Sequence, residues 1–224
     1  MKGEDLTQRS RARIFSAPLG SATSGHLVFT THVAGVTLLA EPALQGLVRG
    51  HFVRRVSWVG FEEGIVMVGY SPDTTSRPDV HCLPLHRPSG PDRLKDEITL
   101  NATIPWEIEV RGDLANLNAD LRGLELHSLD VLGVSSQIRL LLSEPAETTF
   151  IYITGGIRKG TIRVPPGVGI KVQVKGGINN LVFDGQRFAA LDRDINLENS
   201  TFKSATSRCD ICIASGADHL TIEE

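Results

Sequence analysis

A short motif recurs through the second half of this 224-residue chain, consisting of a glycine turn followed by a brief strand pattern of alternating apolar side chains. The copies begin at Gly112, Gly133, Gly156, Gly177 and Gly216, so their spacings are 21, 23, 21 and 39 residues. A strand-rich repeat near 20 residues is typical of a coiled β-solenoid, in which each repeat stacks on its neighbours. The sequence therefore predicts an all-β fold, a single-stranded β-solenoid or a closely related stacked β-fold with short glycine turns.

The composition fits a folded β-protein that has no polyanionic partner. Hydrophobic residues make up 41% of the chain and charged residues 22%, which are the proportions of an ordinary globular protein. Aromatic residues account for only 5%, so the core is expected to consist mainly of Val, Ile and Leu, which suit thin, stacked strands. The net charge of −3 leaves no basic excess, and nucleic acid is therefore not an expected partner.

The pattern divides the chain into four segments. We expect residues 1–25 to form an N-terminal arm and residues 26–70 to form N-terminal β-coils. Five prolines fall within residues 71–93, and because proline lacks the N–H that a strand ladder needs, this segment is interpreted as a loop or linker. Residues 94–224 contain the C-terminal solenoid repeats, and the doubled last spacing predicts an insertion at residues 184–207.

The expected compartment follows from the first residues, the apolar runs and the cysteines. The chain begins with polar and acidic residues, unlike a signal peptide, and no run is apolar enough for a membrane helix. Three cysteines, an odd number, do not form a disulfide framework and fit a reducing compartment. We therefore expect a cytoplasmic protein with no membrane span.

The last residues, 220–224, continue a strand pattern with no helix after them. A solenoid exposes open strand edges unless it is capped, so we expect such an edge here. Glu223 and Glu224 would then be charges that discourage uncontrolled stacking. A regulated contact between strand edges would produce a homo-oligomer.

The glycine and proline punctuation of the second half resembles a known bacterial family. The segments concerned are IPWEIEVRG at 104–112, residues 119–121, the glycine pair at 155–156, VPPGV at 164–168 and GGINNL at 176–181. In these segments the chain is similar to the C-terminal β-solenoid domain of LiaF-like proteins, which are cell-envelope stress regulators, and to the related toastrack domains. The resemblance covers residues 100–224 best. It implies a non-enzymatic regulatory or interaction role with no catalytic residues.

Two groups of Cys and His residues are candidates for metal ligation. Cys209 and Cys212 form a Cys-x-x-Cys, which alone is half of a zinc site. They fall in an alternating strand pattern, where residues three apart point to opposite faces, so the thiols are not expected to share a metal. His81, Cys82 and His86 lie in the proline-rich segment at a spacing that matches no recognised metal site. We therefore predict no metal and no cofactor.

An enzymatic alternative depends on acidic residues in the insertion, namely Asp184, Asp192, Asp194 and Glu198. A polysaccharide-acting β-helix needs a pair of carboxylates in a groove and exposed aromatic side chains that stack on sugars. Here the acidic residues alternate with basic ones in a polar segment, as in a solvated loop, and both tryptophans fall within strand patterns. The familiar hydrolase and NTPase motifs are also absent. The sequence therefore favours a protein without catalytic residues.

One group of cations is a candidate partner-binding face. In a solenoid, residues at matching coil positions form rows on the outer surface. Such a row would dock an acidic partner, whereas the alternative is a merely solvated face. The residues of this predicted face are Arg158, Lys159, Arg163, Lys171 and Lys175.

These observations favour a non-enzymatic interaction or regulatory module that binds protein partners or itself. A filament-forming scaffold of the bactofilin kind is an alternative, because those proteins are also β-solenoids. The long proline-rich segment and the late insertion argue against a smooth filament subunit. A polysaccharide-acting β-helix enzyme is the least favoured alternative.

Overall fold

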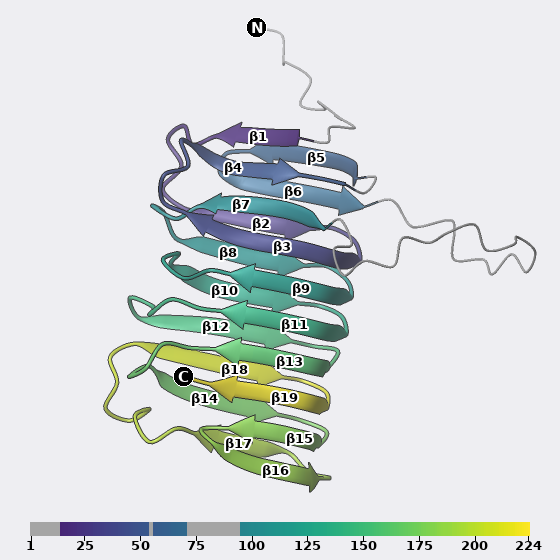
Figure 1. Cartoon of the computed structure of the whole chain (residues 1–224), viewed down its shortest axis with the longest axis vertical. Helices are drawn as coiled ribbons and strands as arrows, with labels where there is room; N and C mark the ends of the chain where they lie inside the picture. Colours follow the sequence, from purple (N-terminus) through teal and green to yellow (C-terminus); the bar gives the residue numbers. More distant parts are fainter. Residues whose placement is uncertain (1–13, 54–55, 71–94) are drawn as a thin grey trace, which may run out of the picture.

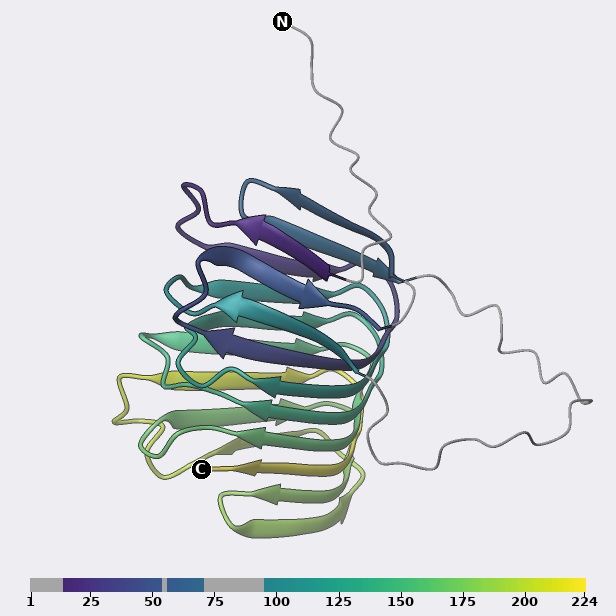
Figure 2. The same ribbon diagram turned by 45° about the horizontal axis from the view of Figure 1, so that its top comes forward.

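The computed structural model describes residues 14–53, 56–70 and 95–224, and these residues form two facing sheets (Figures 1 and 2). Sheet A has, in spatial order, the strands β1 (Ile14–Pro18), β4 (Gly46–His51), β7 (Asp96–Asn101), β3 (Val33–Glu41), β9 (Leu114–Asp120), β11 (Ser135–Leu141), β13 (Ile157–Arg163), β19 (Ala217–Glu223), β15 (Ile178–Phe183) and β16 (Gln186–Leu191). Sheet B has the strands β17 (Ile195–Glu198), β14 (Gly169–Val174), β18 (Arg208–Ile213), β12 (Thr148–Ile153), β10 (Leu126–Val131), β8 (Trp106–Val110), β2 (Gly25–Phe29), β6 (Ile65–Tyr70) and β5 (Val56–Glu62).

The repeating unit is a coil with two strands. Each coil has a sheet B strand, a three-residue turn such as 111–113, and a sheet A strand. Neighbouring coils pair in parallel on both sheets, as in β8 with β10 and β9 with β11. Figure 2 shows the tight turns aligned along one side of the molecule. The expectation of an all-β stacked fold with short glycine turns is confirmed.

Alternating side chains of both sheets fill a narrow core between them. In β10, Leu129 and Val131 point inward, and in β11, Ile138 and Leu140 do so, which gives the period of two expected for half-buried strands. The largest fully buried side chain is that of Trp106, which donates a hydrogen bond from Nε1 to the Asn101 carbonyl at 2.8 Å. No long apolar helix that would cross a membrane occurs in the described ranges.

Sheet A strands of successive coils bend sharply at their third residue. The backbone φ there lies between 53° and 68°, in the left-handed region that Gly and Asn tolerate best. The strand register skips this residue, so that Ser136 pairs with Arg158 and the next pair is Ile138 with Gly160. The result is a corner along which mostly polar side chains project. The residues at this corner are Gly35, Asn116, Gln137, Lys159, His219 and Asn180.

Strands from before and after the 71–93 segment belong to the same two sheets. β2 pairs in parallel with β8, and β3 pairs in parallel with β9. β6 and β7 extend the stack beyond β2 and β3. Antiparallel strands then follow at this end, β5 on sheet B and β4 with β1 on sheet A. The N-terminal β-coils and the C-terminal repeats therefore share one core. The 71–93 segment itself lies outside the described residues.

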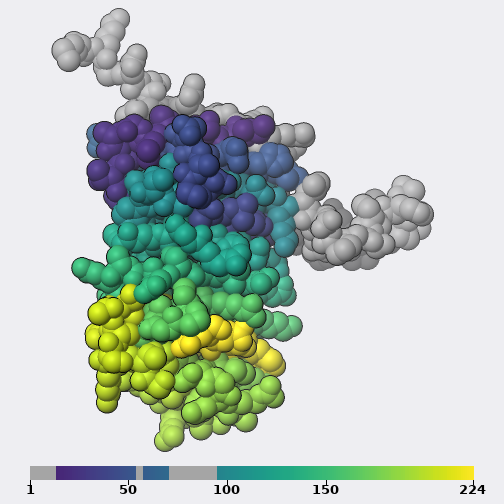
Figure 3. Space-filling view, turned by 60° about the vertical axis from the view of Figure 1, so that its left-hand side comes forward, coloured from purple at the N-terminus to yellow at the C-terminus, as the bar shows by residue number. Residues whose placement is uncertain are grey.

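The C-terminal coil, β18 with β19, lies inside the stack and not at its end. β18 pairs in parallel with β12 on one side and β14 on the other, while β19 pairs with β13 and β15. In Figures 1 and 3 this yellow segment separates two green coils that precede it in the sequence. The chain thus leaves one coil position vacant at 164–168 and fills it from residue 208 onward, which explains the 39-residue spacing.

This arrangement corrects the expectation that the last strand is an exposed edge. β19 has neighbours on both sides, and Glu223 accepts a hydrogen bond from Arg163 Nε at 2.6 Å. The edges of the two sheets beyond β14 and β15 are formed by the 184–207 insertion, which contains two strands, β16 and β17. They pair antiparallel with β15 and β14, respectively. The insertion therefore closes the end of the solenoid and is not simply an irregular loop.

Candidate interaction surface

Four large exposed hydrophobic side chains lie on two neighbouring coils near the middle of the solenoid. Leu132, Val134, Phe150 and Tyr152 are 52%, 49%, 54% and 39% exposed, and we call them the apolar patch. They come from β12 and from the turn after β10, which belong to neighbouring coils. Elsewhere in the described chain such side chains are separate, as for Ile65 on β6 at the other end of sheet B. Exposed apolar side chains on neighbouring coils are candidates for an interaction site.

The alternation of β12 explains why two aromatic rings face outward. Thr149, Ile151 and Ile153 are buried between the sheets, so Phe150 and Tyr152 must point to the outer face of sheet B. The two rings therefore stand two residues apart on one flat strand surface. This is the most exposed aromatic pair of the described residues.

Polar side chains border this pair on the neighbouring strands. Across β10, Ser128 is the register partner of Phe150, and Asp130 is the partner of Tyr152. Across β18, Asp210 is the partner of Phe150, and Cys212 is the partner of Tyr152. The aromatic pair therefore has a carboxylate on each side.

A shallow depression of about 190 Å³ lies between β12, β18 and β14. Phe150 and Tyr152 form one wall, and Lys171 with Gln173 forms the other. Asp210 lies between them, and its Oδ1 is buried with no hydrogen-bond partner among the described residues. An unpaired buried carboxylate oxygen is costly, and its burial keeps this atom from direct contact with a group in the depression.

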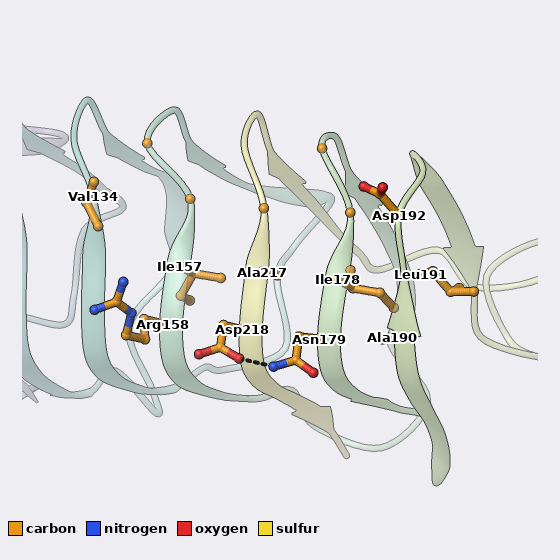
Figure 4. Close-up of a pocket in the computed structure, with 15 residues that line it drawn as sticks. Val134, Ile157, Arg158, Ile178, Asn179, Ala190, Leu191, Asp192, Ala217 and Asp218 are labelled. Atoms are coloured by element: carbon orange, nitrogen blue, oxygen red, sulfur yellow. Dashed lines mark hydrogen bonds between the residues drawn. The ribbon is translucent and has the colours of Figure 1, made fainter.

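A second concavity, a groove of about 570 Å³, follows the turns between the two sheets (Figure 4). Val134 of the apolar patch lies in its wall, so the groove and the patch are continuous. Figure 4 shows Arg158, Asp218 and Asn179 on successive strands along the groove, with Asp192 near one end. The floor consists largely of glycine backbone, which leaves the main chain open to an approaching partner.

Asp218 is the centre of a polar network beside this groove. Its Oδ1 lies 2.7 Å from His219 Nδ1 and accepts a hydrogen bond of 2.7 Å from Asn179 Nδ2. The contact with His219 has the largest effect, and together with the hydrogen bond from Asn179 it holds the pKa of the Asp218 carboxyl below its ordinary value. The carboxylate is therefore ionised at neutral pH, and its network gives the groove a polar rim.

The predicted cationic face is divided between the two sheets. Arg158, Lys159 and Arg163 lie on β13 of sheet A, whereas Lys171 lies on β14 of sheet B and Lys175 directly follows that strand. The five cations therefore do not form one row. Arg163 also pairs with Glu223. Arg158 alone of the five lines the groove.

The two thiols of Cys-x-x-Cys point to opposite faces, as strand alternation predicted. Cys209 is buried between the sheets, and Cys212 is half-buried on the outer face of sheet B. Burial raises the pKa of the Cys209 thiol to about 12, so that it stays protonated at neutral pH. No group of three His, Cys, Asp or Glu residues suited to a metal occurs within the described residues. His81, Cys82 and His86 lie outside them.

The acidic residues of the insertion lie at three places in the structure. Asp194 accepts a hydrogen bond from the Gly176 backbone N–H at 2.9 Å, Asp192 lines the groove, and Glu198 is the register partner of Lys171 on the other sheet. Asp184 lies in the turn between β15 and β16. Asp192 and Asp194 therefore lie beside the same turn, at 176–177, whereas Asp184 and Glu198 lie elsewhere. The residues that sequence reasoning missed are Phe150 and Tyr152.

Comparison with known proteins supports the fold. No family model and no curated protein matches this chain. A crystal structure from Clostridium sporogenes, described as a "putative cell adhesion protein", matches with a TM-score of 0.62 and 18% identity. The match covers 94% of this chain and 98% of that one. At this identity the likeness shows a shared fold along nearly the whole chain.

Proposed function

We propose that this protein is a non-enzymatic interaction module that binds a protein partner through the outer face of sheet B. The apolar patch carries the proposal, because its four side chains gather on two adjacent coils while the strands around them are polar outside. Flat sheet faces with exposed aromatic rings resemble the centres of protein interfaces, where Tyr and Phe are enriched. The role as a partner-binding regulator also agrees with the resemblance to LiaF-like domains, and a cytoplasmic location remains part of the proposal.

The ends of the solenoid support binding by a face over end-to-end polymerisation. Antiparallel strands close both ends, and the edge strand β17 has only four residues. The other edge strand at that end, β16, carries Arg187. Short and charged edge strands are devices that prevent strand addition. A partner-binding module is therefore favoured over a filament-forming scaffold of the bactofilin kind.

The proposal predicts that peptides selected for binding to the wild type lose affinity for Phe150→Ser/Tyr152→Ser. We expect at least about a tenfold loss, because truncating central aromatic residues of an interface typically costs more than ~1 kcal/mol each. A random peptide library is selected on the purified protein, and fluorescence anisotropy gives the affinities. Ile65→Ser is the matched control, since Ile65 is 39% exposed, like Tyr152, but lies at the far end of sheet B.

Both variants are expected to fold, because exposed positions change stability by little, within ~0.5 kcal/mol in most cases. Circular dichroism and thermal melting check this. Selected peptides that bind the wild type, the aromatic variant and Ile65→Ser equally well would show that the apolar patch is not the binding surface.

A further inference from the structure

Two carboxylates flank the aromatic pair at the distance of one strand. Adjacent strands lie ~4.8 Å apart, and register partners face the same side of a sheet. Asp130 therefore stands next to Tyr152 on the β10 side, and Asp210 stands next to Phe150 on the β18 side. The carboxylates lie diagonally across the pair, so a group placed over the rings is close to both.

Neither carboxylate is neutralised by an ion pair within the described residues. Other acids on this protein have such partners, as Glu109 has with Arg111 at 2.8 Å and Asp120 has with Arg122 at 2.6 Å. Asp130 and Asp210 form none, although Lys171 is the register partner of Asp210. Asp210 Oδ1 is moreover buried and without a hydrogen-bond donor in this part of the chain.

The size of the depression beside the rings restricts what it can hold. At about 190 Å³ it is smaller than small-molecule pockets, which are ~300–1,000 Å³. It suits one long side chain of a partner that lies along the sheet. Leu132 and Val134 extend the apolar area beyond the rings and would contact the neighbouring residues of that partner.

We infer that the partner presents a basic segment, in which an Arg or Lys side chain lies over Phe150 and Tyr152 between the Asp130 and Asp210 carboxylates. An aromatic face attracts a cation electrostatically. The two carboxylates, which form no ion pair within the described residues, add charge-assisted hydrogen bonds, which are stronger than neutral ones. This inference depends on the proposed function, because it names the chemistry of the partner at the same face.

The charge near the rings also favours a basic partner over the acidic partner that the five cations predicted from the sequence. The outer face near the rings holds Glu107, Asp130 and Asp210. Its cations are Lys171, the register partner of Asp210, and Arg208, which lies on the strand of Asp210 and over the Phe202 ring at 5.2 Å. Its local excess is therefore negative, although Arg158 and Lys159 lie on the other sheet. Complementary potentials guide association, so this face favours a basic segment.

The test uses three fluorescein-labelled peptides that share one leucine-containing scaffold. At the same two positions, the first peptide carries Arg, the second Gln and the third Glu. Affinities are measured for the wild type, Asp130→Asn, Asp210→Asn and the double variant. Asp184→Asn is the control, because Asp184 is an exposed carboxylate in a turn at the far end of the solenoid. Fluorescence anisotropy is recorded at low and high NaCl.

We expect the wild type to bind the Arg peptide at least about tenfold more tightly than the Gln peptide, and the Glu peptide most weakly. Each single substitution should weaken the Arg peptide by about tenfold and the Gln peptide much less, since the lost charge–charge attraction acts only on the cationic ligand. Salt should reduce the preference because exposed charges are screened. The Asp184→Asn protein should behave as the wild type.

Other outcomes overturn the inference in distinct ways. Equal binding of the Arg, Gln and Glu peptides, lost in Phe150→Ser/Tyr152→Ser, would leave the binding face in place and refute the basic partner. Arg-peptide binding that survives the aromatic variant would refute both the face and the inference. Absence of binding by any peptide at millimolar concentration, or competition by neutral oligosaccharides at this face, would also contradict a basic protein segment.

Discussion

A protein that ends at Ser207, and so lacks the C-terminal coil, is expected to lose cooperative folding. Ile211, Ile213, Leu220 and Ile222 are buried at 0–1% exposure, and burial of each contributes ~1.5–3 kcal/mol, so that roughly 6–12 kcal/mol is lost together. This loss is similar to the whole stability of a domain, ~5–15 kcal/mol. Removing the coil also unpairs β12 and β13 on one side and β14 and β15 on the other.

Thermal unfolding followed by circular dichroism measures this effect. We expect no cooperative transition in the truncated protein, and partial recovery when a synthetic peptide of residues 208–224 is added, because the vacant position accepts that sequence. A truncated protein that melts cooperatively within about 5 °C of the full chain, a difference of only ~1–2 kcal/mol, would contradict the internal position of the coil.

Gly155→Ala is expected to be strongly destabilising for a single methyl addition at a coil turn. A Cβ at residue 155 would lie 2.5 Å from the carbonyl carbon of Gly133 and 2.6 Å from the Val134 nitrogen, both backbone atoms of the neighbouring coil. Because successive turns nest against each other, the stack would have to open. We expect a loss of ~2–3 kcal/mol, the upper part of the range for overpacking.

Gly216→Ala provides the matched control for this substitution. Residue 216 lies in the corresponding turn of the inserted coil, one position later than residue 155, and a Cβ there would meet only the carbonyl oxygens of Gly176 and Gly177, at 3.5 Å, an ordinary contact. We expect a change of less than ~1 kcal/mol. Urea titration of both variants gives the free energies of unfolding. Equal losses in the two proteins would show that nesting of the turns is not what requires glycine at residue 155.

The sequence contains the strands and turns of this fold but not the order of its coils. Glycine spacing and apolar alternation define each coil by local chemistry, and the opposite directions of Cys209 and Cys212 follow from alternation alone. The pattern is the same whichever coil lies next to it, so the insertion of β18 and β19 between earlier coils is not encoded locally. The 39-residue spacing between Gly177 and Gly216 was the one sequence feature that indicated this insertion.

The candidate surface was harder to predict for a related reason. Residues 150–153 form a continuous run of apolar side chains, and such a run does not indicate which side chains face outward. Thr149 is polar and would suggest the opposite phase, but its hydroxyl donates a hydrogen bond to the Leu126 carbonyl at 2.6 Å and is buried, so Phe150 and Tyr152 lie on the outside. The cationic residues were grouped as matching positions of successive coils, but the turn at 164–168 carries the chain from sheet A to sheet B between Arg163 and Lys171.

The most direct test of binding by the outer face of sheet B is a map of the backbone amide NMR shifts during titration with a peptide selected on the wild type. The account predicts that the largest shifts fall on β10, β12 and β18, around Asp130, Tyr152 and Asp210. Shifts concentrated on the edge strands β16 and β17, with β12 unchanged, would contradict it and would place the partner at the end of the solenoid.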